Sequence, residues 1–341
     1  MRLFVTGATG FIGAHTARRF AEAGYTLRLL LRPQSRCDLL DGVPFERADG
    51  DVTDRASVER ALPGCDAVVH IAGVTSFLPK DAARVHAVNV DGVRNVLESA
   101  LAQGLRKVLF TSSVSAVGAS RSPHGLLDES STWDLHREAN AYVRSKRHGE
   151  EAAMAIAARG LDLITVCPTV VLGPGDQYGS STLFLLNYVK GRFPAYIEGG
   201  QSYVDVRDVA EGHLLAFEKG VPGERYILSA ENVSAADFVA LLGRTAGMRP
   251  IPKMPYAIAA AAAAGSELLA RFNPKFADFN RGTVSVGRLY WYFHAHKSRE
   301  ALGLTYRSIE QSARDTLVWA MQHGFLRPNN PTLKALHAEH P

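Results

Sequence analysis

The stretch Leu3-Phe-Val-Thr-Gly-Ala-Thr-Gly-Phe-Ile-Gly13 decides the fold of this 341-residue chain. Its apolar start predicts a buried strand, and the apolar spacing that follows predicts a helix from about Ile12 to Ala23. Between them, Gly7 permits a tight turn, Gly10 lets the backbone approach a pyrophosphate, and Gly13 allows the helix to pack closely on the strand. The order of strand, glycine turn and helix therefore indicates a dinucleotide-binding α/β fold rather than an ordinary glycine-rich turn.

The first turn of this helix predicts where the phosphates of a dinucleotide would bind. Backbone N–H groups at a helix N-terminus have no partner within the helix and can donate to phosphate oxygens. We therefore expect cofactor contacts from Thr9, Phe11 and Ile12 in addition to the three glycines.

A basic residue ends the next predicted strand, which runs from Leu27 to Leu31. An acidic residue at this place would accept hydrogen bonds from a ribose 2′-OH, whereas arginine pairs with a 2′-phosphate. Arg32, with Arg36 close behind, therefore favours NADP(H) over NAD(H). A solvated basic loop is the alternative interpretation.

Strands and helices alternate through the first half of the chain. Apolar runs predict strands at residues 66–71, 107–111 and 161–166 and a helix over residues 87–102. Such alternation indicates βαβ units and hence a doubly wound parallel sheet. Asp51 and Val52 follow one more predicted strand, so we expect them near the adenine ring.

The second half of the chain predicts a smaller substrate-binding lobe. We expect residues 1–170 to form the cofactor-binding domain, with residues 203–230 returning to it, and residues 171–202 and 231–326 to form the lobe. The apolar run Tyr256 to Gly265 is too short to span ~30 Å of hydrocarbon. It predicts a packed helix, with peripheral membrane contact as the alternative. Residues 327–341 carry three prolines and no periodic pattern, which predicts a loosely held tail.

The composition argues against several classes of protein. The net charge of +4 comes from interspersed charges, so no nucleic-acid-binding stripe is expected. Cys37, Cys65 and Cys167 are far apart and odd in number, which fits a reducing compartment and predicts neither disulfides nor a zinc site. The first strand leaves no room for a signal peptide. We expect a cytoplasmic protein with no metal, no nucleic-acid partner and no integral membrane segment.

The segment Tyr142-Val-Arg-Ser-Lys146 predicts a proton donor. Residues four apart lie on one face of a helix, so the Lys146 ammonium is expected beside the Tyr142 hydroxyl. A tyrosine has a pKa near ~10, and a neighbouring positive charge lowers it. General acid and base catalysis would follow. An exposed helix face with a half-buried tyrosine is the alternative for this spacing alone.

Five motifs in order give the chain a resemblance to a known family over nearly its whole length. They are Gly7-x-x-Gly10-x-x-Gly13, Asp51-Val52, His70-Ile71-Ala72-Gly73, Thr111-Ser112-Ser113 and Tyr142-x-x-x-Lys146. Together they resemble the extended short-chain dehydrogenase/reductase family, and residues 110–113 and 168–174 resemble its dihydroflavonol 4-reductase and 3β-hydroxysteroid dehydrogenase branch. The resemblance implies a Rossmann domain with further cofactor contacts from Ile71, Ala72, Gly73, Thr111, Pro168, Val170, Tyr142 and Lys146.

The same resemblance implies catalytic roles. Ser113 would hydrogen-bond the substrate carbonyl while Tyr142 donates its proton, with Ser112 and Ser115 as alternatives for the serine. Lys146 would lower the pKa of Tyr142 and hold the nicotinamide ribose. Asn89 looks like the helix-stabilising asparagine of the family, and a plain N-cap is the alternative.

The substrate is expected to be partly apolar. Plant dihydroflavonol reductases hold the flavonoid with an asparagine that would fall at Gly118, so a flavonoid is not expected. Residues expected to face the substrate, with core or lid packing as the alternative, are Thr75, Phe77, Val114, Tyr178 and Tyr203.

These expectations together predict an NADPH-dependent reductase of a ketone or aldehyde on a moderately apolar small molecule. A nucleotide-sugar epimerase with tightly bound NAD(P) is the alternative, and a non-catalytic NADP-sensing module is less favoured. The helices around residues 90–102 and 142–158 resemble those that pair in the family, which implies a homodimer.

Overall fold

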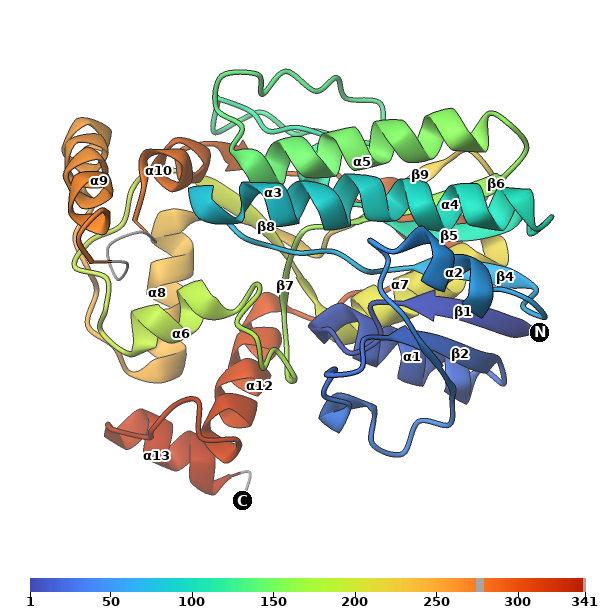
Figure 1. Ribbon diagram of the computed structural model, residues 1–341. Helices are drawn as coiled ribbons and strands as arrows, with labels where there is room; N and C mark the ends of the chain where they lie inside the picture. The colour runs from blue at the N-terminus through green and yellow to red at the C-terminus, as the bar shows by residue number, and fades with distance from the viewer. Residues whose placement is uncertain (274–278, 340–341) are drawn as a thin grey trace.

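A parallel sheet forms the larger part of the protein. The computed structural model describes residues 1–273 and 279–339, and in these residues seven strands pair in the order β3-β2-β1-β4-β5-β6-β9 (Figure 1). The strands are β1 (Arg2–Thr6), β2 (Thr26–Leu31), β3 (Glu46–Asp49), β4 (Ala67–His70), β5 (Lys107–Thr111), β6 (Asp162–Pro168) and β9 (Arg225–Leu228). All neighbours are parallel. The chain runs outward in both directions from β1, which confirms the predicted Rossmann fold.

Helices cover both faces of this sheet because successive residues of each strand point to opposite sides. Leu3 and Val5 face α1 (Phe11–Glu22) and α7 (Val206–Lys219), and Phe4 faces the other side. That side is covered by α2 (Arg55–Ala61), α4 (Gly92–Ala102) and α5 (Ala141–Ala157). In Figure 1, α4 and α5 run side by side above the sheet, and α1 lies below it.

The helix predicted over residues 87–102 begins earlier and is irregular. It consists of α3 (Ala82–His86), a π-helical turn η3 (Ala87–Asp91) and α4. The single-turn helices η1 (Asp38–Leu40), η2 (Pro79–Asp81) and η4 (Val114–Ala116) lie in loops of the same domain. The π-helical turn places Asn89 inside the helix rather than at its N-cap.

A second, smaller sheet belongs to the other lobe. In the described residues it contains β7 (Val170–Leu172), β8 (Gly200–Asp205), β10 (Glu231–Ser234) and β11 (Tyr290–Trp291). The helices of the second half are α6 (Leu183–Val189), α8 (Ala235–Ala246), α9 (Tyr256–Ala270), α10 (Arg281–Gly287), α11 (His296–Leu302), α12 (Ile309–Gln322) and α13 (Pro331–Ala338). Since β8 pairs with β7 and β10, residues 203–205 lie in this sheet, and the chain returns to the large sheet only with α7 and β9.

Residues 331–338 form a helix within the segment 327–341 that was expected to be a loosely held tail, of which residues 340–341 lie outside the described part. Asn330 caps α13 by accepting a hydrogen bond from the backbone N–H of Leu333, and Pro331 occupies its first turn. Leu333 and Leu336 are buried against the core of the smaller lobe. The expectation was wrong because proline at the start of a helix favours the helix instead of breaking it.

The alanine-rich helix α9 also differs from the prediction. The sequence predicted a packed helix, but the buried side chains of α9 are Ala259 and Ala263. Most of its other residues face outward. No helix in the described part of the chain has both the length and the apolarity needed to cross a membrane.

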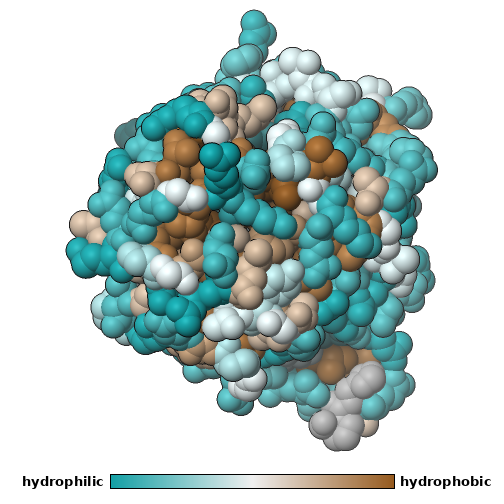
Figure 2. All heavy atoms as spheres, turned by 90° about the vertical axis from the view of Figure 1, so that its right-hand side faces the viewer, coloured by the Kyte–Doolittle hydropathy of each residue, from teal (hydrophilic) through white to brown (hydrophobic). Residues whose placement is uncertain are grey.

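The surface on the side of the N-terminus shows no site. Hydrophilic residues cover most of this side, and apolar residues are interspersed among them (Figure 2). The carboxyl ends of the parallel strands point away from it (Figure 1). A ligand site of this fold is therefore expected on the opposite edge of the sheet.

We predict that Leu333→Ala lowers the free energy of unfolding by about 2–5 kcal/mol, because it removes a fully buried side chain from the core that joins α13 to α12. Urea unfolding of the full chain measures this. Lys334→Ala is the matched control on the exposed side of α13 and should change stability by less than about 0.5 kcal/mol. Equal stability of the two variants would show that α13 is not part of the folded core.

Candidate active site

The loops that follow four strands of the large sheet meet at its carboxyl edge. The glycine turn follows β1, residues 71–73 follow β4, residues 112–113 follow β5, and residues 169–170 follow β6. Strands β2 and β3 are added on one side of β1, and β4 and the later strands are added on its other side. Open α/β sheets bind ligands at such a switch in strand order. The predicted cofactor residues Ile71, Ala72, Gly73, Thr111, Pro168 and Val170 lie at this edge.

Two of the three glycines are required by the packing of the chain itself. Gly7 has φ +78°, and a Cβ there would lie 2.5 Å from the backbone nitrogen of Ala72. A Cβ on Gly13 would lie 2.0 Å from the carbonyl oxygen of Gly7. For Gly10 the nearest atom would be that same oxygen, at 3.3 Å, so Gly10 is less constrained by the protein.

The start of α1 fits an anionic group. Gly10 is the N-cap, no side chain caps the helix, and its first turn has no acidic residue. The first amides of α1, including those of Phe11 and Ile12, are therefore left to an outside acceptor, and Thr9 lies in the same turn. A pyrophosphate fits this arrangement.

Three arginines lie near the ends of β2 and β3. Arg32 is exposed, and its side chain forms no ion pair with the described residues. The Arg36 guanidinium is 2.6 Å from the Asp38 carboxylate, so its charge is partly compensated. Arg47, which the sequence analysis missed, donates to the carbonyl oxygen of Arg32 at 3.1 Å. The register of β2 with β3 brings Arg47 there, and only the pairing of the strands reveals it.

Asp51 and Val52 have local roles in the turn after β3. The Asp51 carboxylate accepts hydrogen bonds from the backbone N–H and the hydroxyl of Thr53, at 2.9 and 2.8 Å. Val52 is buried against Gly92 of α4, where a Cβ would lie 2.9 Å from its side chain. A contact of either residue with adenine stays a prediction.

The structure brings the hydroxyl groups of Ser113, Tyr142 and Thr75 together. Hydrogen bonds join the Tyr142 hydroxyl to the side chains of Ser113 and Thr75. The ring of Phe77 packs edge-on against the Tyr142 ring, with 5.4 Å between centroids. The Ser113 hydroxyl also accepts a hydrogen bond from the backbone N–H of Ser115, at 3.1 Å.

Ser112, the alternative to Ser113, is engaged elsewhere. Its hydroxyl donates to the buried carboxylate of Glu150. Its side chain therefore binds to α5 beneath the site, and Ser113 is the serine that contacts Tyr142.

Burial governs the electrostatics of the tyrosine and the lysine. It raises the pKa of Tyr142, an effect partly offset by the hydrogen bonds with Ser113 and Thr75. Burial also lowers the pKa of Lys146 to about 8. The predicted lowering of the Tyr142 pKa is therefore not seen in the protein alone, where desolvation of the phenol outweighs the hydrogen bonds that oppose it.

The Lys146 ammonium lies between the ends of β4 and β5. It donates a hydrogen bond to the carbonyl oxygen of Thr111 at 3.2 Å, and a Cβ on Gly73 would lie 3.8 Å from it. Among the described residues no second acceptor binds this ammonium group. Its other N–H groups are available to a ligand.

Asn89 supports the loop that carries Thr75 and Phe77. Its side-chain oxygen accepts from the backbone N–H of Val74 at 2.8 Å, and its nitrogen donates to the Val74 carbonyl at 2.9 Å. The same nitrogen donates to the Ser145 hydroxyl on α5 at 2.9 Å. Asn89 thus ties this loop to α5, and the N-cap alternative is wrong.

A buried ion pair beneath the site was missed by the sequence analysis. Glu150 lies one helical turn after Lys146 and is 2.9 Å from the guanidinium of Arg225 on β9. Arg225 also donates to the carbonyl oxygens of Glu129 and Ser131, at 2.8 and 3.2 Å. A buried charge pair persists when its remaining polar atoms are hydrogen-bonded, as here. The sequence offered one signal for Glu150: it follows Lys146 by four residues and therefore lies on the same face of the helix.

Two buried histidines are neutral supports. His70 is hydrogen-bonded to the Thr6 hydroxyl at 2.7 Å, and burial lowers its pKa to about 3. The Thr111 hydroxyl is hydrogen-bonded to His213 of α7 at 2.8 Å, and burial lowers the pKa of His213 to about 4. Both rings fix the ends of strands.

The residues predicted to face the substrate separate into two groups. Thr75 and Phe77 contact Tyr142, and Val114 is buried in the cluster against which Tyr142 packs. Tyr203 stacks on Phe238 with 4.4 Å between centroids inside the core of the lobe, so its prediction as a substrate residue is wrong. Tyr178 is exposed, and its role stays a prediction.

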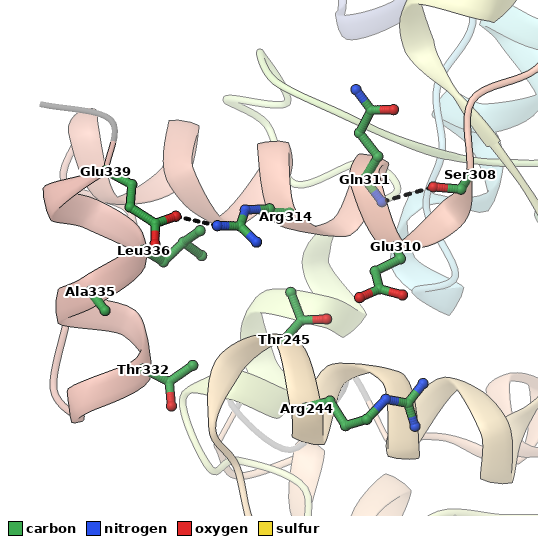
Figure 3. A pocket seen from close by; sticks show the side chains of 10 residues that line it. All are labelled: Arg244, Thr245, Ser308, Glu310, Gln311, Arg314, Thr332, Ala335, Leu336 and Glu339. Carbon is green, nitrogen blue, oxygen red and sulfur yellow. Dashed lines mark hydrogen bonds and ion pairs between the residues drawn. The ribbon is translucent and has the colours of Figure 1, made fainter.

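A groove in the smaller lobe lies apart from these residues. It has a volume of about 540 Å³ and lies between α8, α12 and α13 (Figure 3). Its lining is mostly polar, with Arg314 hydrogen-bonded to Glu339, and α13 lies well away from α5 in Figure 1. None of the predicted site residues lines it.

Comparisons with known proteins agree with this geometry. The model of the NAD dependent epimerase/dehydratase family matches residues 3–229. A "Putative dihydroflavonol 4-reductase" of Synechocystis is 34% identical over 95% of this chain and 96% of that protein. "Sterol demethylase protein B" of Methylococcus capsulatus is 32% identical over 96% of this chain and 100% of that protein. The crystal structure of gox2253 superposes with a TM-score of 0.84 at 34% identity, covering 95% of this chain and 99% of that one.

We predict that Lys146→Met stabilises the protein alone at pH 7. The pKa of Lys146 is lowered by burial to about 8, so below that pH the folded state holds a desolvated charge, at a cost of up to about 3 kcal/mol. This cost disappears as the pH rises from 8 toward the ordinary lysine value. The gain measured by urea unfolding should therefore shrink between pH 7 and pH 10. A variant less stable than the wild type at pH 7 would contradict the assignment.

Proposed function

This chain belongs to the NAD-dependent epimerase/dehydratase family and is an NAD(P)-dependent oxidoreductase, and from that premise we propose that it is an NADPH-dependent reductase. Its substrate is a ketone or aldehyde on a moderately apolar small molecule. The observation that carries the proposal is the contact between the Tyr142 and Ser113 hydroxyls at the sheet edge where the glycine turn opens α1.

The two hydroxyls define where the carbonyl oxygen binds. An oxygen placed between them accepts one hydrogen bond from Ser113 and one from Tyr142, so negative charge developing on it is stabilised. Tyr142 then transfers its proton to that oxygen. NADPH, when bound, supplies the hydride. Because burial raises the pKa of Tyr142, the phenol stays protonated at neutral pH, which suits a proton donor.

In this proposal Lys146 binds and orients the nicotinamide ribose, and it does not transfer a proton to the substrate. Its ammonium is fixed by the Thr111 carbonyl and keeps N–H groups for the hydroxyls of the nicotinamide ribose. The amides at the start of α1 would hold the pyrophosphate. These two anchors lie on either side of the loop after β4, as a dinucleotide lying across the sheet edge requires.

The preference for NADP(H) rests on Arg32. Its exposed guanidinium, free of ion pairs with the described residues, can form charge-assisted hydrogen bonds with a 2′-phosphate. Arg47, whose guanidinium is paired with Asp49 at 2.8 Å, donates to the Arg32 carbonyl and so fixes the backbone that carries Arg32.

The apolar character of the substrate rests on the surroundings of Tyr142. Phe77 covers one side of its ring, and Val114 belongs to the cluster beneath it. One of the relatives named above is a sterol demethylase protein by name, and the ring system of a sterol is largely apolar.

A nucleotide-sugar epimerase is the second candidate, favoured by the name of the matching family. Such an enzyme would retain its nicotinamide through the catalytic cycle. Cofactor that copurifies in stoichiometric amount, without net NADPH oxidation by any carbonyl compound, would favour it.

We also propose a homodimer in which α4 and α5 of two copies pair, and analytical ultracentrifugation would test it.

We predict that Tyr142→Phe lowers kcat by about 10²- to 10⁴-fold while NADPH affinity changes little, because the variant loses the proton but keeps the ring against Phe77. Steady-state kinetics and NADPH fluorescence titration measure the two effects. Tyr256→Phe, on an exposed tyrosine of the smaller lobe, is the matched control and should match the wild type. Wild-type turnover in Tyr142→Phe would end the proposal.

We predict that Arg32→Asp lowers the preference for NADPH over NADH by about 10- to 100-fold, since it removes a charge-assisted contact and adds a repelling carboxylate. The ratio of kcat/KM for the two cofactors measures it. Arg36→Asp should change the ratio less, because Asp38 already holds that guanidinium. An unchanged ratio in Arg32→Asp refutes the role of this residue.

A further inference from the structure

Helix α9 carries an apolar surface that the rest of the described chain leaves uncovered. The large apolar side chains of this surface are exposed: Tyr256 by 40%, Ile258 by 57%, Leu268 by 56%, Leu269 by 50% and Phe272, just beyond the helix end, by 85%. At about 3.6 residues per turn, Ile258, Leu268 and Leu269 fall on one side of the helix, with alanine and glycine between them. We call these five residues the α9 surface.

The α9 surface is not the outer side of an ordinary amphipathic helix. A surface helix turns its apolar side to the core and its charged side to water. In α9 the small residues Ala259 and Ala263 face the core, where they pack with Val284 of α10. The large apolar residues point outward, and Glu267 is the single charged residue of the helix. Figure 1 shows α9 at the outer edge of the smaller lobe, beside α10.

Positive charge borders the α9 surface at both ends. The Arg288 guanidinium lies over the ring of Tyr256, 4.5 Å from its centroid. Arg271 is exposed beside Phe272 and has no ion-pair partner in the described residues. The carboxylate of Glu267 is 2.8 Å from Arg281 and is therefore already paired. Between Gly247 and Tyr290 the sequence has six basic and two acidic residues.

We propose that the α9 surface docks on a lipid bilayer that contains anionic headgroups. Apolar side chains enter the boundary of the acyl chains, and flanking arginines meet the phosphates, which is how interfacial helices bind. The contact is peripheral, because no helix of the described residues can cross a membrane.

The charges favour a bilayer over a second copy of the chain. In a twofold pairing of two α9 helices, their ends would meet antiparallel, with Arg271 of one copy near Arg288 of the other. Like charges would then face each other, and Glu267 is not available to compensate them. An anionic bilayer supplies the missing negative charge along the whole helix.

The α9 surface is connected to the candidate active site. Asn280, at the start of α10, donates a hydrogen bond to the carbonyl oxygen of Phe77 at 3.3 Å. Phe77 in turn packs on Tyr142. Docking of α9 therefore places a lipid surface beside α10, whose N-cap residue Asn280 contacts the loop of the site.

Sedimentation of the full-length protein with vesicles tests this proposal. The vesicles contain phosphatidylcholine alone or phosphatidylcholine with one third phosphatidylglycerol. We expect binding to the anionic vesicles that weakens with salt, and a decrease of about tenfold or more in the partition coefficient for Leu268→Glu/Leu269→Glu. Arg271→Ala should lower it about fivefold, as expected for one basic residue near the surface.

Val221→Glu is the matched control, because Val221 is 56% exposed on a different part of the protein. It should bind as the wild type does. Urea unfolding of each variant distinguishes lost docking from lost folding. Wild-type protein that does not sediment with anionic vesicles overturns the proposal, as does unchanged binding of the double variant.

Self-association would also overturn it. In that case the wild type without lipid would sediment as a dimer in the ultracentrifuge, and Leu268→Glu/Leu269→Glu would be monomeric. Vesicle binding requires no turnover, so a failure of the reductase proposal leaves this result unaffected.

Discussion

The position of α5 against the carboxyl ends of the large sheet is the constraint on which the site depends. Gly149 allows α5 to approach η3 closely, since a Cβ there would lie 2.2 Å from the carbonyl oxygen of Asn89. On α5, Lys146 lies one helical turn before Glu150. The Glu150 carboxylate binds Ser112 and Arg225. Because these contacts fix α5, the Tyr142 hydroxyl meets that of Ser113, and the proposed chemistry depends on this contact.

Local patterns in the sequence predicted the fold, and they named Ser113 and Tyr142, whose hydroxyl groups the structure brings together. The glycine turn and the alternation of apolar strands and helices each depend on residues close in sequence. From these two patterns the doubly wound parallel sheet could be predicted. The features that were missed depend on what lies opposite each residue after folding. Arg47 reaches the Arg32 carbonyl through strand pairing, and Tyr203 belongs to a core that Phe238 completes. No single segment contains that information.

Desolvation explains why the electrostatics could not be predicted from spacing. Residues four apart on a helix do share a face, but the free energy of a charge there depends on how much water remains around it. Desolvation of Tyr142 and Lys146 opposes charge on both groups, and the protein accepts this cost at its site. The effect of a proline is also hard to predict from sequence. Pro331 starts a helix inside the segment that was predicted to be a loosely held tail. The outward-facing side of α9 shows that an apolar run also does not reveal which side of a helix the core covers.

The central claim is that hydride passes from NADPH to a carbonyl carbon beside Tyr142 with net oxidation of the cofactor. The most direct measurement uses NADPH carrying two deuterium atoms at C4 of the nicotinamide, so that hydride from either face is labelled, mixed with the wild-type protein and a panel of ketones and aldehydes. The account predicts one deuterium on the carbinol carbon of a product alcohol, with one NADP⁺ formed per alcohol. Deuterium that stays on a protein-bound nicotinamide, with no alcohol formed from any compound of the panel, would contradict it.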